Sequence, residues 1–485
     1  EANAVIDVTL TDSNGGTVTQ QVTADGGGAW TLNTNELDAS GLADGAATVS
    51  ATATDAAGNV SAAATANVTI DNTVPTAPTV APDLTDASDT GASNTDDITS
   101  DTTPTVSWIG GTYGDTVTLY ADGVPVGTAT VQPDGSYSVT PDAPLADGTP
   151  ALTVTFTDPS GNESAPSPAL PITVDAAVPA VPTINGPIED DDFISATEQA
   201  DVSVSGMAEA NSTVDVTFTD GSGDTVTAQV TANGSGVWTL DGNEVDISGL
   251  DEGSITVDAI VTDAAGNVSP TASATVTKDT GLPSVPTIDS FSTDTGTPGD
   301  GITSDNRPTF NGTAEADSTV EVFLNGASIG TTTADGTGNW SLVYDNSFSL
   351  SDDTYDAIAT ATDAAGNSTS SVTPFTIVVD ANTPIAPVIL GFDSLINIDE
   401  QVDVGVSGTA EPNATIDITF TDGSGATVTG QTTADNDGDW SLFGNGADLT
   451  SLQEGSITID ATSTDAAGNV SSADSVTVTK DITPP

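Results

Sequence analysis

The octet Thr262-Asp263-Ala264-Ala265-Gly266-Asn267-Val268-Ser269 sets the period of the whole chain. The same eight residues recur at 54–61 and 464–471, and looser copies begin at Thr157 and Thr362. The aspartates of the five copies follow one another at steps of 103, 105, 100 and 102 residues. A motif that returns at such a steady period indicates tandem domains rather than one large fold.

Two further motifs keep this phase. Four repeats carry a tryptophan in Gly-x-Trp-Ser/Thr-Leu, at positions 30, 238, 340 and 440, whereas the second repeat has Tyr137 there and carries Trp108 elsewhere. An aspartate followed shortly by proline marks a linker after each repeat. The predicted domains are residues 1–74, 75–178, 179–282, 283–383 and 384–485. Because the first begins at the equivalent of Glu209, we expect it to lack about two strands and the chain to be a segment of a longer array.

Each complete repeat offers seven short segments in which apolar and polar residues alternate, as in Val320-Glu321-Val322-Phe323-Leu324. In the fourth repeat they lie near 285–291, 307–313, 318–324, 327–333, 339–344, 355–362 and 370–379. Turn residues such as Asn-Gly and Ala-Asp-Gly separate them. Seven strands and one core tryptophan predict an all-β, immunoglobulin-like β-sandwich, and the tandem copies predict an extended rod. A three-stranded solenoid would have a period of roughly 20–30 residues instead.

Two kinds of repeat alternate along the chain. The second and fourth share Ile-Thr-Ser-Asp, at 98–101 and 302–305, each shortly after an Asp-Thr-Gly that begins at Asp89 or Asp294. The third and fifth have Glu-Gln in this region, at Glu198 and Glu400, followed by Val-Ser-Gly. The first repeat resembles the third and fifth.

Composition excludes several classes of function. The chain has 71 acidic and 3 basic side chains, a net charge of −68, and neither cysteine nor histidine. Disulfides, thiolate nucleophiles, imidazole bases and ordinary zinc or haem sites are therefore absent. Nucleic acid and anionic membranes would be repelled, and no apolar run is long enough to insert into a bilayer. Only carboxylate pairs remain for catalysis, so a glycosidase is the one sensible enzyme class. It would need a cleft outside the repeats, and we therefore expect no enzyme.

Strand direction predicts where the carboxylates gather. If the first strand of each domain runs from top to bottom, three loops lie at the top, beside the linker aspartate of the preceding domain. They are the B–C loop, the loop before the tryptophan strand and the F–G turn that holds the octet. Ca²⁺ takes six to eight oxygen ligands in a tolerant geometry, whereas Mg²⁺ demands a strict octahedron. We therefore predict Ca²⁺ at each junction between domains.

The predicted ligands come in four sets, one for each junction. They are Asp71, Asp158 and Asn162 at the first junction; Asp175, Glu209, Asp263 and Asn267 at the second; Asp279, Glu315, Asp363 and Asn367 at the third; and Asp380, Glu411, Asp465 and Asn469 at the fourth. Asp115 is a substitute for the glutamate that the first set lacks. A second cluster is expected at the bottom of the domains, from Asp96, Asp101 and Asp147 and from Asp300, Asp305, Asp352 and Asp353.

Simpler interpretations stand beside these. Asp-x-x-Gly-Asn in a hairpin is common turn chemistry, since Asp and Asn bind local backbone groups. The recurrence of a linker aspartate 16 or 17 residues after each octet aspartate favours the metal. The tryptophans that keep the period are expected in the core rather than at a sugar site. Lys278 and Lys480 precede linker aspartates, so a salt bridge is the simplest expectation.

Together the octet, the tryptophan motif and the Asp-x-x-x-Pro-x-x-Pro linker resemble the bacterial Ig-like repeats of very large adhesins exported by type I secretion. The resemblance covers the whole chain. It implies a passive extender at the bacterial cell surface, with Ca²⁺ between neighbouring repeats, that holds an adhesive tip away from the cell for attachment or biofilm formation. The alternative is a module that associates with like chains through its edge strands, as a calcium-dependent matrix or cell–cell contact.

Overall fold

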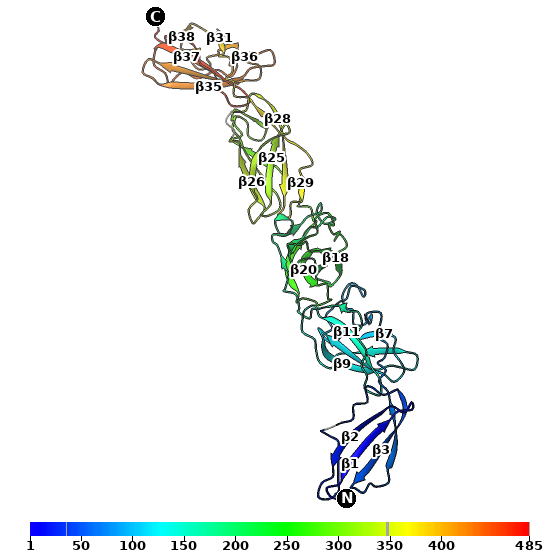
Figure 1. Cartoon of the computed structure of the whole chain (residues 1–485). Helices are drawn as coiled ribbons and strands as arrows, with labels where there is room; N and C mark the ends of the chain where they lie inside the picture. Colours follow the sequence, from blue (N-terminus) through cyan, green and yellow to red (C-terminus); the bar gives the residue numbers. More distant parts are fainter. Residues whose placement is uncertain (35, 346–348, 485) are drawn as a thin grey trace.

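The structure is a computed structural model that describes residues 1–34, 36–345 and 349–484. Asn35, residues 346–348 and Pro485, which belong to the predicted first, fourth and fifth domains, lie outside the described residues. Figure 1 shows β-sandwich domains that follow one another end to end, with the two termini at opposite ends of an elongated molecule. Among the described residues the helical structure is one 3-10 turn, η1 (Ile188–Asp190), and no helix is long and apolar enough to cross a membrane. The predicted all-β, rod-like architecture is confirmed.

Repeat 3 shows the complete sandwich. One sheet has the order β14-β16-β19 and the other the order β15-β21-β20-β17-β18. Their bounds are β14 (Thr183–Ile184), β15 (Phe193–Ile194), β16 (Ser205–Met207), β17 (Thr213–Thr219), β18 (Thr225–Thr231), β19 (Val237–Thr239), β20 (Gly253–Thr262) and β21 (Ala272–Lys278). Alternate residues of β17 and β20 are buried, so the inner faces of the two sheets enclose one apolar core.

Repeats 5 and 4 repeat this arrangement. Repeat 5 pairs β31-β33-β36 and β32-β38-β37-β34-β35, and repeat 4 pairs β22-β24-β27 and β23-β30-β28-β25-β26. The strands of repeat 4 are β22 (Ser290–Ser292), β23 (Ile302–Thr303), β24 (Thr309–Thr313), β25 (Thr319–Leu324), β26 (Ala327–Thr333), β27 (Asn339–Val343), β28 (Asp353–Thr362), β29 (Ser368–Ser370) and β30 (Phe375–Val379). Those of repeat 5 are β31 (Val388–Gly391), β32 (Leu395–Ile396), β33 (Ser407–Thr409), β34 (Thr415–Asp422), β35 (Thr427–Thr433), β36 (Asp439–Ser441), β37 (Gly455–Thr464) and β38 (Asp474–Lys480).

In repeat 4 the structure has a strand that the sequence pattern did not predict. β22 overlaps the expected segment 285–291 and pairs antiparallel with β24, whereas β23, between the expected segments 285–291 and 307–313, lies in the other sheet and pairs parallel with β30. The same parallel pairing joins β15 to β21 and β32 to β38. The segment that connects β22 to β23 is rich in Asp, Gly and Pro, which favour turns over a continuous strand. β23 has only two residues, too few to show an alternation of apolar and polar residues, so the pattern did not reveal the change of sheet.

Repeats 1 and 2 depart from this pattern. Repeat 2 forms β10-β7-β5, β12-β11-β8-β9 and the parallel pair β13-β6. Its strands are β5 (Asp83–Leu84), β6 (Ile98–Thr99), β7 (Val106–Ile109), β8 (Thr116–Ala121), β9 (Val124–Thr130), β10 (Ser136–Val139), β11 (Ala151–Thr157), β12 (Leu170–Pro171) and β13 (Thr173–Val174). The described residues of repeat 1 form a single sheet, β2-β1-β3-β4, from β1 (Val5–Thr11), β2 (Thr17–Thr23), β3 (Gly45–Thr54) and β4 (Ala64–Ile70).

The periodic tryptophans are core residues in three repeats and not in the first. Trp238, Trp340 and Trp440 are at most 4% exposed, which confirms the expectation for them. Trp30 is 43% exposed, so the expectation that it packs in the core is wrong. The described residues of repeat 1 contain no counterpart of β14 and β16, the strands that lie beside the tryptophan strand in repeat 3.

Each buried tryptophan lies opposite a glycine on the neighbouring strand. Trp238 pairs with Gly206, Trp340 with Gly312 and Trp440 with Gly408. A Cβ atom on Gly206 would stand 1.8 Å from the carbonyl oxygen of Thr183 and 2.8 Å from the indole of Trp238. The glycine therefore lets the indole and the first strand of the repeat approach each other closely.

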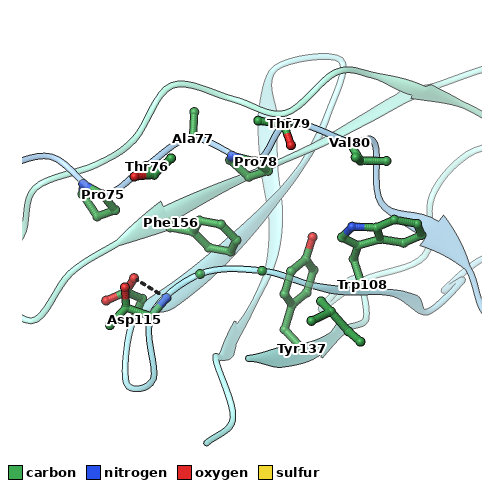
Figure 2. A pocket seen from close by; sticks show the side chains of 14 residues that line it. Pro75, Thr76, Ala77, Pro78, Thr79, Val80, Trp108, Asp115, Tyr137 and Phe156 are labelled. Carbon is green, nitrogen blue, oxygen red and sulfur yellow. Dashed lines mark hydrogen bonds between the residues drawn. The ribbon is translucent and has the colours of Figure 1, made fainter. Parts of the chain in front are cut away.

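In repeat 2 both positions of this pair hold aromatic residues. Tyr137 takes the tryptophan position and is buried, and Trp108 takes the glycine position opposite it and is 38% exposed. Figure 2 shows both rings beside the linker segment 75–80, together with Phe156, in a pocket of about 320 Å³. The Tyr137 hydroxyl has no hydrogen-bond partner among the described residues, and burial raises its pKa to about 12. Trp108 and Tyr137 line this pocket with the linker, whereas repeats 3, 4 and 5 have a glycine opposite the tryptophan.

The two buried lysines form no salt bridge with the linker aspartates in the described part of the chain, so that expectation is wrong. Lys278 and Lys480 are 3% and 1% exposed. The Lys278 ammonium donates to the main-chain oxygens of Ile247, Ser248 and Leu250, and that of Lys480 donates to the equivalent oxygens of Leu449 and Leu452. Successive residues of a strand point to opposite faces. Because both lysines are buried, each lies on the face that points into its domain. There it holds the loop before strand β20 or β37.

A carboxylate holds the same loop from its other side. Asp220, at the end of β17, accepts the backbone N–H of Asp251 at 2.8 Å as well as those of Ser222 and Asp224 in its own turn. The Asp251 N–H is the main reason that the pKa of Asp220 is lowered to about 2. Asp422 is equivalent in repeat 5, where Gln453 donates and the pKa is also about 2.

We predict that Gly206→Ala destabilises repeat 3. The added Cβ meets backbone at 1.8 Å, which cannot relax as a flexible side chain could. Overpacking of this kind costs roughly 1–3 kcal/mol or more. Calorimetric unfolding of the full chain should show one transition moved to lower temperature. Gly221→Ala is the control, because nothing lies within 4 Å of its added Cβ. Equal transitions for the two variants would contradict this account of the core.

We predict that Asp220→Asn destabilises repeat 3 at neutral pH and has little effect near pH 2. The folded pKa of about 2 lies below the ordinary value, so the carboxylate stabilises the fold above about pH 4 and loses that contribution as the pH falls through about 2. Calorimetry at pH 6 and pH 2 measures the difference. Asp224→Asn is the control, since this carboxylate is exposed in the same turn. A shift of the same size at both pH values would exclude the charge as the cause.

Candidate metal and linker sites at the domain junctions

The F–G turn of the octet is built by its own aspartate and asparagine. In repeat 3, Asp263 Oδ1 accepts the backbone N–H of Asn267 at 2.8 Å, and its Oδ2 accepts from the Asn267 amide at 2.9 Å. Repeats 2, 4 and 5 have the same two bonds. The turn chemistry that was the simpler interpretation of the octet is therefore present.

The asparagine amide also reaches the preceding domain. Its Nδ2 donates to the main-chain oxygen of the linker aspartate 88 to 92 residues earlier. The four pairs are Asn162 with Asp71 at 3.0 Å, and Asn267 with Asp175, Asn367 with Asp279 and Asn469 with Asp380 at 2.8 Å. The linker aspartate and the next F–G turn thus lie together at every junction, as the strand directions predicted.

The linker aspartate is held from its own domain as well. Its backbone N–H donates to the short strand that crosses between the sheets, as Asp175 does to Thr99 at 2.9 Å and Asp279 does to Ile194 at 3.0 Å. Its Oδ1 accepts the backbone N–H two residues later, at 3.0 Å in both cases. The linker therefore leaves each domain in a defined direction.

An acidic residue of the E–F loop fixes the next residue of the linker in all five repeats, a contact that the sequence reading missed. Each carboxylate accepts one linker N–H, at 2.7 to 3.0 Å. The five pairs are Asp44 with Asn72, Asp147 with Ala176, Glu252 with Thr280, Asp352 with Ala381 and Glu454 with Ile482. The available signal was an acid 28 or 29 residues before each of these linker positions.

This contact changes the interpretation of the second cluster. Asp147 and Asp352 were expected there, but their carboxylates bind the linker. Asp101 accepts from Ser88 and Thr103, and Asp305 from the backbone of Thr293 and Arg307. Local donors therefore already bind these oxygens, and the second cluster stays a prediction.

The predicted ligands come together most clearly at the junction between repeats 2 and 3. Burial raises the pKa of Glu209, and the negative charges of Asp263 and Asp175 raise it further. At the next junction Glu315 instead accepts the backbone N–H of linker residue Ser284 at 3.0 Å. Within residues 1–34, 36–345 and 349–484, no three acidic side chains are grouped closely enough to hold a metal ion. The four ligand sets therefore stay a prediction.

Two aspartates that the site prediction left out have buried oxygens without a hydrogen-bond partner in the described part of the chain. They are Asp89 and Asp294, each at the start of an Asp-Thr-Gly loop. Asp89 is 5% exposed, and burial is the main cause of its raised pKa, followed among the raising causes by the charges of Asp96 and Asp83. The sequence showed that the Asp-Thr-Gly loop occurs in alternate repeats, but nothing in it indicated that the aspartate of this loop is buried.

Comparison with solved structures places the chain beside repeats of bacterial adhesins. A tetra-tandem repeat from the extending region of a large adhesion protein is 27% identical over 79% of this chain and 96% of its own, with a TM-score of 0.32. A Ca²⁺-stabilised adhesin that helps an Antarctic bacterium reach out and bind ice is 28% identical over 84% and 100%, with a TM-score of 0.33. Part of a 1.5-MDa bacterial ice-binding adhesin is 26% identical over 62% and 99%, with a TM-score of 0.27.

TM-scores this low show that the structures resemble each other, but they do not show that the repeats are arranged in the same way or bind the same ligands. No curated protein matches the chain. Family models give a firmer result, since that of the bacterial Ig-like domain matches residues 1–72, 75–176 and 282–381, more than half of the chain. A model of a second bacterial Ig domain matches residues 394–480. With its sandwich topology and its matched repeats, the chain belongs to the bacterial Ig-like domain family.

Proposed function

We propose that this chain is a non-catalytic stalk segment of a large secreted bacterial adhesin, which projects an adhesive tip from the cell surface. The observation that carries the proposal is the serial junction. Every linker is short, and the same hydrogen bonds from the domains before and after it fix its course. Domains joined in this way keep an extended arrangement, whereas Gly/Ser-rich linkers would let them tumble. Membership of the bacterial Ig-like domain family agrees with this role.

Calcium is the second part of the proposal. At the junction between repeats 2 and 3, burial and then the negative charges of Asp263 and Asp175 raise the pKa of Glu209. A divalent cation among them would remove that repulsion and add bonds between two domains. Carboxylate oxygens have more than one lone pair, so those that already accept an N–H can still bind an ion. We assign the other predicted sets to the equivalent junctions.

The carboxylates of the chain fit Ca²⁺ better than smaller divalent ions. They come from separate loops and from the linker, so their spacing can adjust to six to eight ligands at 2.3–2.6 Å. Within the cell, where free calcium is low, the junctions would lack the bonds that an ion adds, and they would stiffen further after export. The absence of cysteine agrees with a route that has no oxidative folding step. We propose the cell surface as the location and attachment, including biofilm formation, as the purpose.

Small-angle X-ray scattering in millimolar Ca²⁺ and in excess chelator tests the proposal. In calcium we expect a maximum dimension on the order of 150–200 Å, from sandwiches about 25–35 Å tall joined in series. In chelator the dimension should fall and its distribution broaden, because like-charged junctions bend. An unchanged profile would reject calcium-dependent stiffening. A dimension that grows with protein concentration would support self-association through edge strands instead of the stalk.

Titration calorimetry of Glu209→Gln assigns the ion to a junction. Loss of one carboxylate should weaken Ca²⁺ binding at that site roughly tenfold, since the number of charged ligands sets the affinity. Asp224→Asn removes the same charge from an exposed turn and serves as the control. If the two variants bind calcium equally, Glu209 is not a ligand and the proposed set is wrong at this junction.

A further inference from the structure

The Asp-Thr-Gly loops of repeats 2 and 4 contact the following repeat in the same way. Thr90 Oγ1 donates to the main-chain oxygen of Ala265 at 2.6 Å, and Thr295 Oγ1 donates to that of Ala467 at 2.5 Å. Both acceptors lie in the F–G turn of the next domain, and both alanines are 1% exposed. The same contact occurs twice, about 200 residues apart in the chain, which indicates a specific interface between these repeats.

The threonine hydroxyl is oriented by its own domain. Thr90 Oγ1 accepts the backbone N–H of Ser100 at 2.7 Å, and Thr295 Oγ1 accepts that of Ser304 at 2.7 Å. A hydroxyl has one hydrogen to donate, so this bond directs that hydrogen to the next repeat. The Ile-Thr-Ser-Asp motif that accompanies each Asp-Thr-Gly thereby acquires a role, since it supplies the orienting serine.

The glycine that follows permits close backbone contact. A Cβ atom on Gly91 would stand 2.2 Å from the Ala264 oxygen, and one on Gly296 would stand 2.1 Å from the Ala466 oxygen. From the other side, a Cβ on Gly266 would meet the Gly91 nitrogen at 2.9 Å, and one on Gly468 would meet the Gly296 nitrogen at 2.7 Å. Two glycines therefore face each other across each of these junctions, where any side chain would push the domains apart.

The loop is also anchored within its own repeat. Ser88 donates to Asp101 at 3.0 Å and accepts the backbone N–H of Thr105 at 3.0 Å. In repeat 4, Asp294 Oδ2 accepts the backbone N–H of Gly299 at 2.6 Å. A loop held in its docked shape before contact loses little entropy on docking.

The junction between repeats 3 and 4 lacks this contact although the receiving turn is the same. Residues 362–367 repeat the Thr-Asp-Ala-Ala-Gly-Asn of residues 262–267, yet nothing lies within 4 Å of a Cβ built on Gly366. Repeat 3 has no Asp-Thr-Gly before its crossing strand β15. Besides the bond from Asn367 to Asp279 that every junction shares, its link to this turn is one bond from the Ala196 N–H to Asn367 Oδ1 at 2.9 Å. At the junction between repeats 1 and 2, Gly161 is equally free of neighbours within 4 Å.

We propose that the Asp-Thr-Gly loop is a docking element that locks its repeat onto the F–G turn of the next one, so that the rod consists of rigid two-repeat units, 2–3 and 4–5, joined at more mobile junctions. The partner that fits the loop is an Ala-Ala-Gly turn whose main-chain oxygen accepts the threonine hydroxyl and whose glycine leaves no side chain in the way. The element is independent of calcium, because its bonds are made by neutral groups.

Distance measurements between spin labels test the pairing in the full chain. The protein has no cysteine, so single cysteines introduced on the exposed edge strands at Thr128, Thr227, Thr331 and Thr429 label one repeat each. In chelator, we expect narrow distributions for the pairs 128/227 and 331/429. The 227/331 distribution should be roughly twofold wider, because relative motion is the default for a small interface.

Thr90→Val should widen the 128/227 distribution to that of 227/331 and leave 331/429 unchanged, while Thr90→Ser, which keeps the hydroxyl, should have no effect.

Gly266→Ala and Gly366→Ala form a second matched pair. Both glycines have φ near +88°, at +89° and +86°, so the local strain is equal, and only the first meets a neighbouring domain. Three equal widths in chelator, or an unchanged 128/227 width in Thr90→Val, would overturn the proposal whether or not calcium binds.

Discussion

The architecture depends on one hydrogen bond that is made at every junction, from the F–G asparagine amide to the main-chain oxygen of the preceding linker aspartate. The asparagine can reach that oxygen because its own aspartate has already fixed the turn. The linker can offer it because the crossing strand and the E–F acid hold the linker in place. Each of these local bonds is worth only about 1 kcal/mol. Their effect is directional, since they convert the end of one domain and the start of the next into a single structured segment.

The acidity of the chain has a structural explanation as well as an electrostatic one. Aspartate is short enough to bind backbone N–H groups two to four residues away, and the chain uses it in this way at turn after turn, as at Asp25, Asp134 and Asp335. Hydrogen bonds favour the charged form. Backbone N–H groups are the main cause of the lowered pKa of Asp25, whereas for Asp134 and Asp335 the main cause is the hydroxyl of Ser136 or Thr337, followed by backbone N–H groups. The balance reverses where carboxylates are buried near one another, as at Glu209 and Asp89. At these two positions, which adjoin domain junctions, burial and neighbouring negative charges outweigh the hydrogen-bond donors. Burial is also the main cause of the raised pKa of Asp97 and Glu189.

The sequence alone predicted the sandwich, the period, the core tryptophans of three repeats and the meeting of linker with F–G turn, because each depends on local pattern or strand direction. It did not predict the crossing strands, such as β23, because two residues are too few to show an alternation of apolar and polar residues. The inward direction of Lys278 was also hidden, since carbonyl groups distant in sequence satisfy its ammonium group. The hydrogen bond from the Thr280 N–H to Glu252 could not be predicted without knowing which loop faces the linker. Trp30 shows the reverse case, in which a core motif is present and the strands that would cover it are not among the described residues.

Near-identical repeats can therefore differ in mechanics through very few residues. The receiving turn is the same in repeats 3, 4 and 5, and a threonine and a glycine in the preceding loop decide whether it is occupied. Domains joined in series bend first at their most compliant junction, so the stiffness of the rod follows from the weaker class of contact and not from the average. Alternating two kinds of repeat sets the spacing of the compliant points at two domain lengths. An array can then be lengthened by whole pairs without changing how it bends, which is a physical reason for a repeat family to keep two alternating forms.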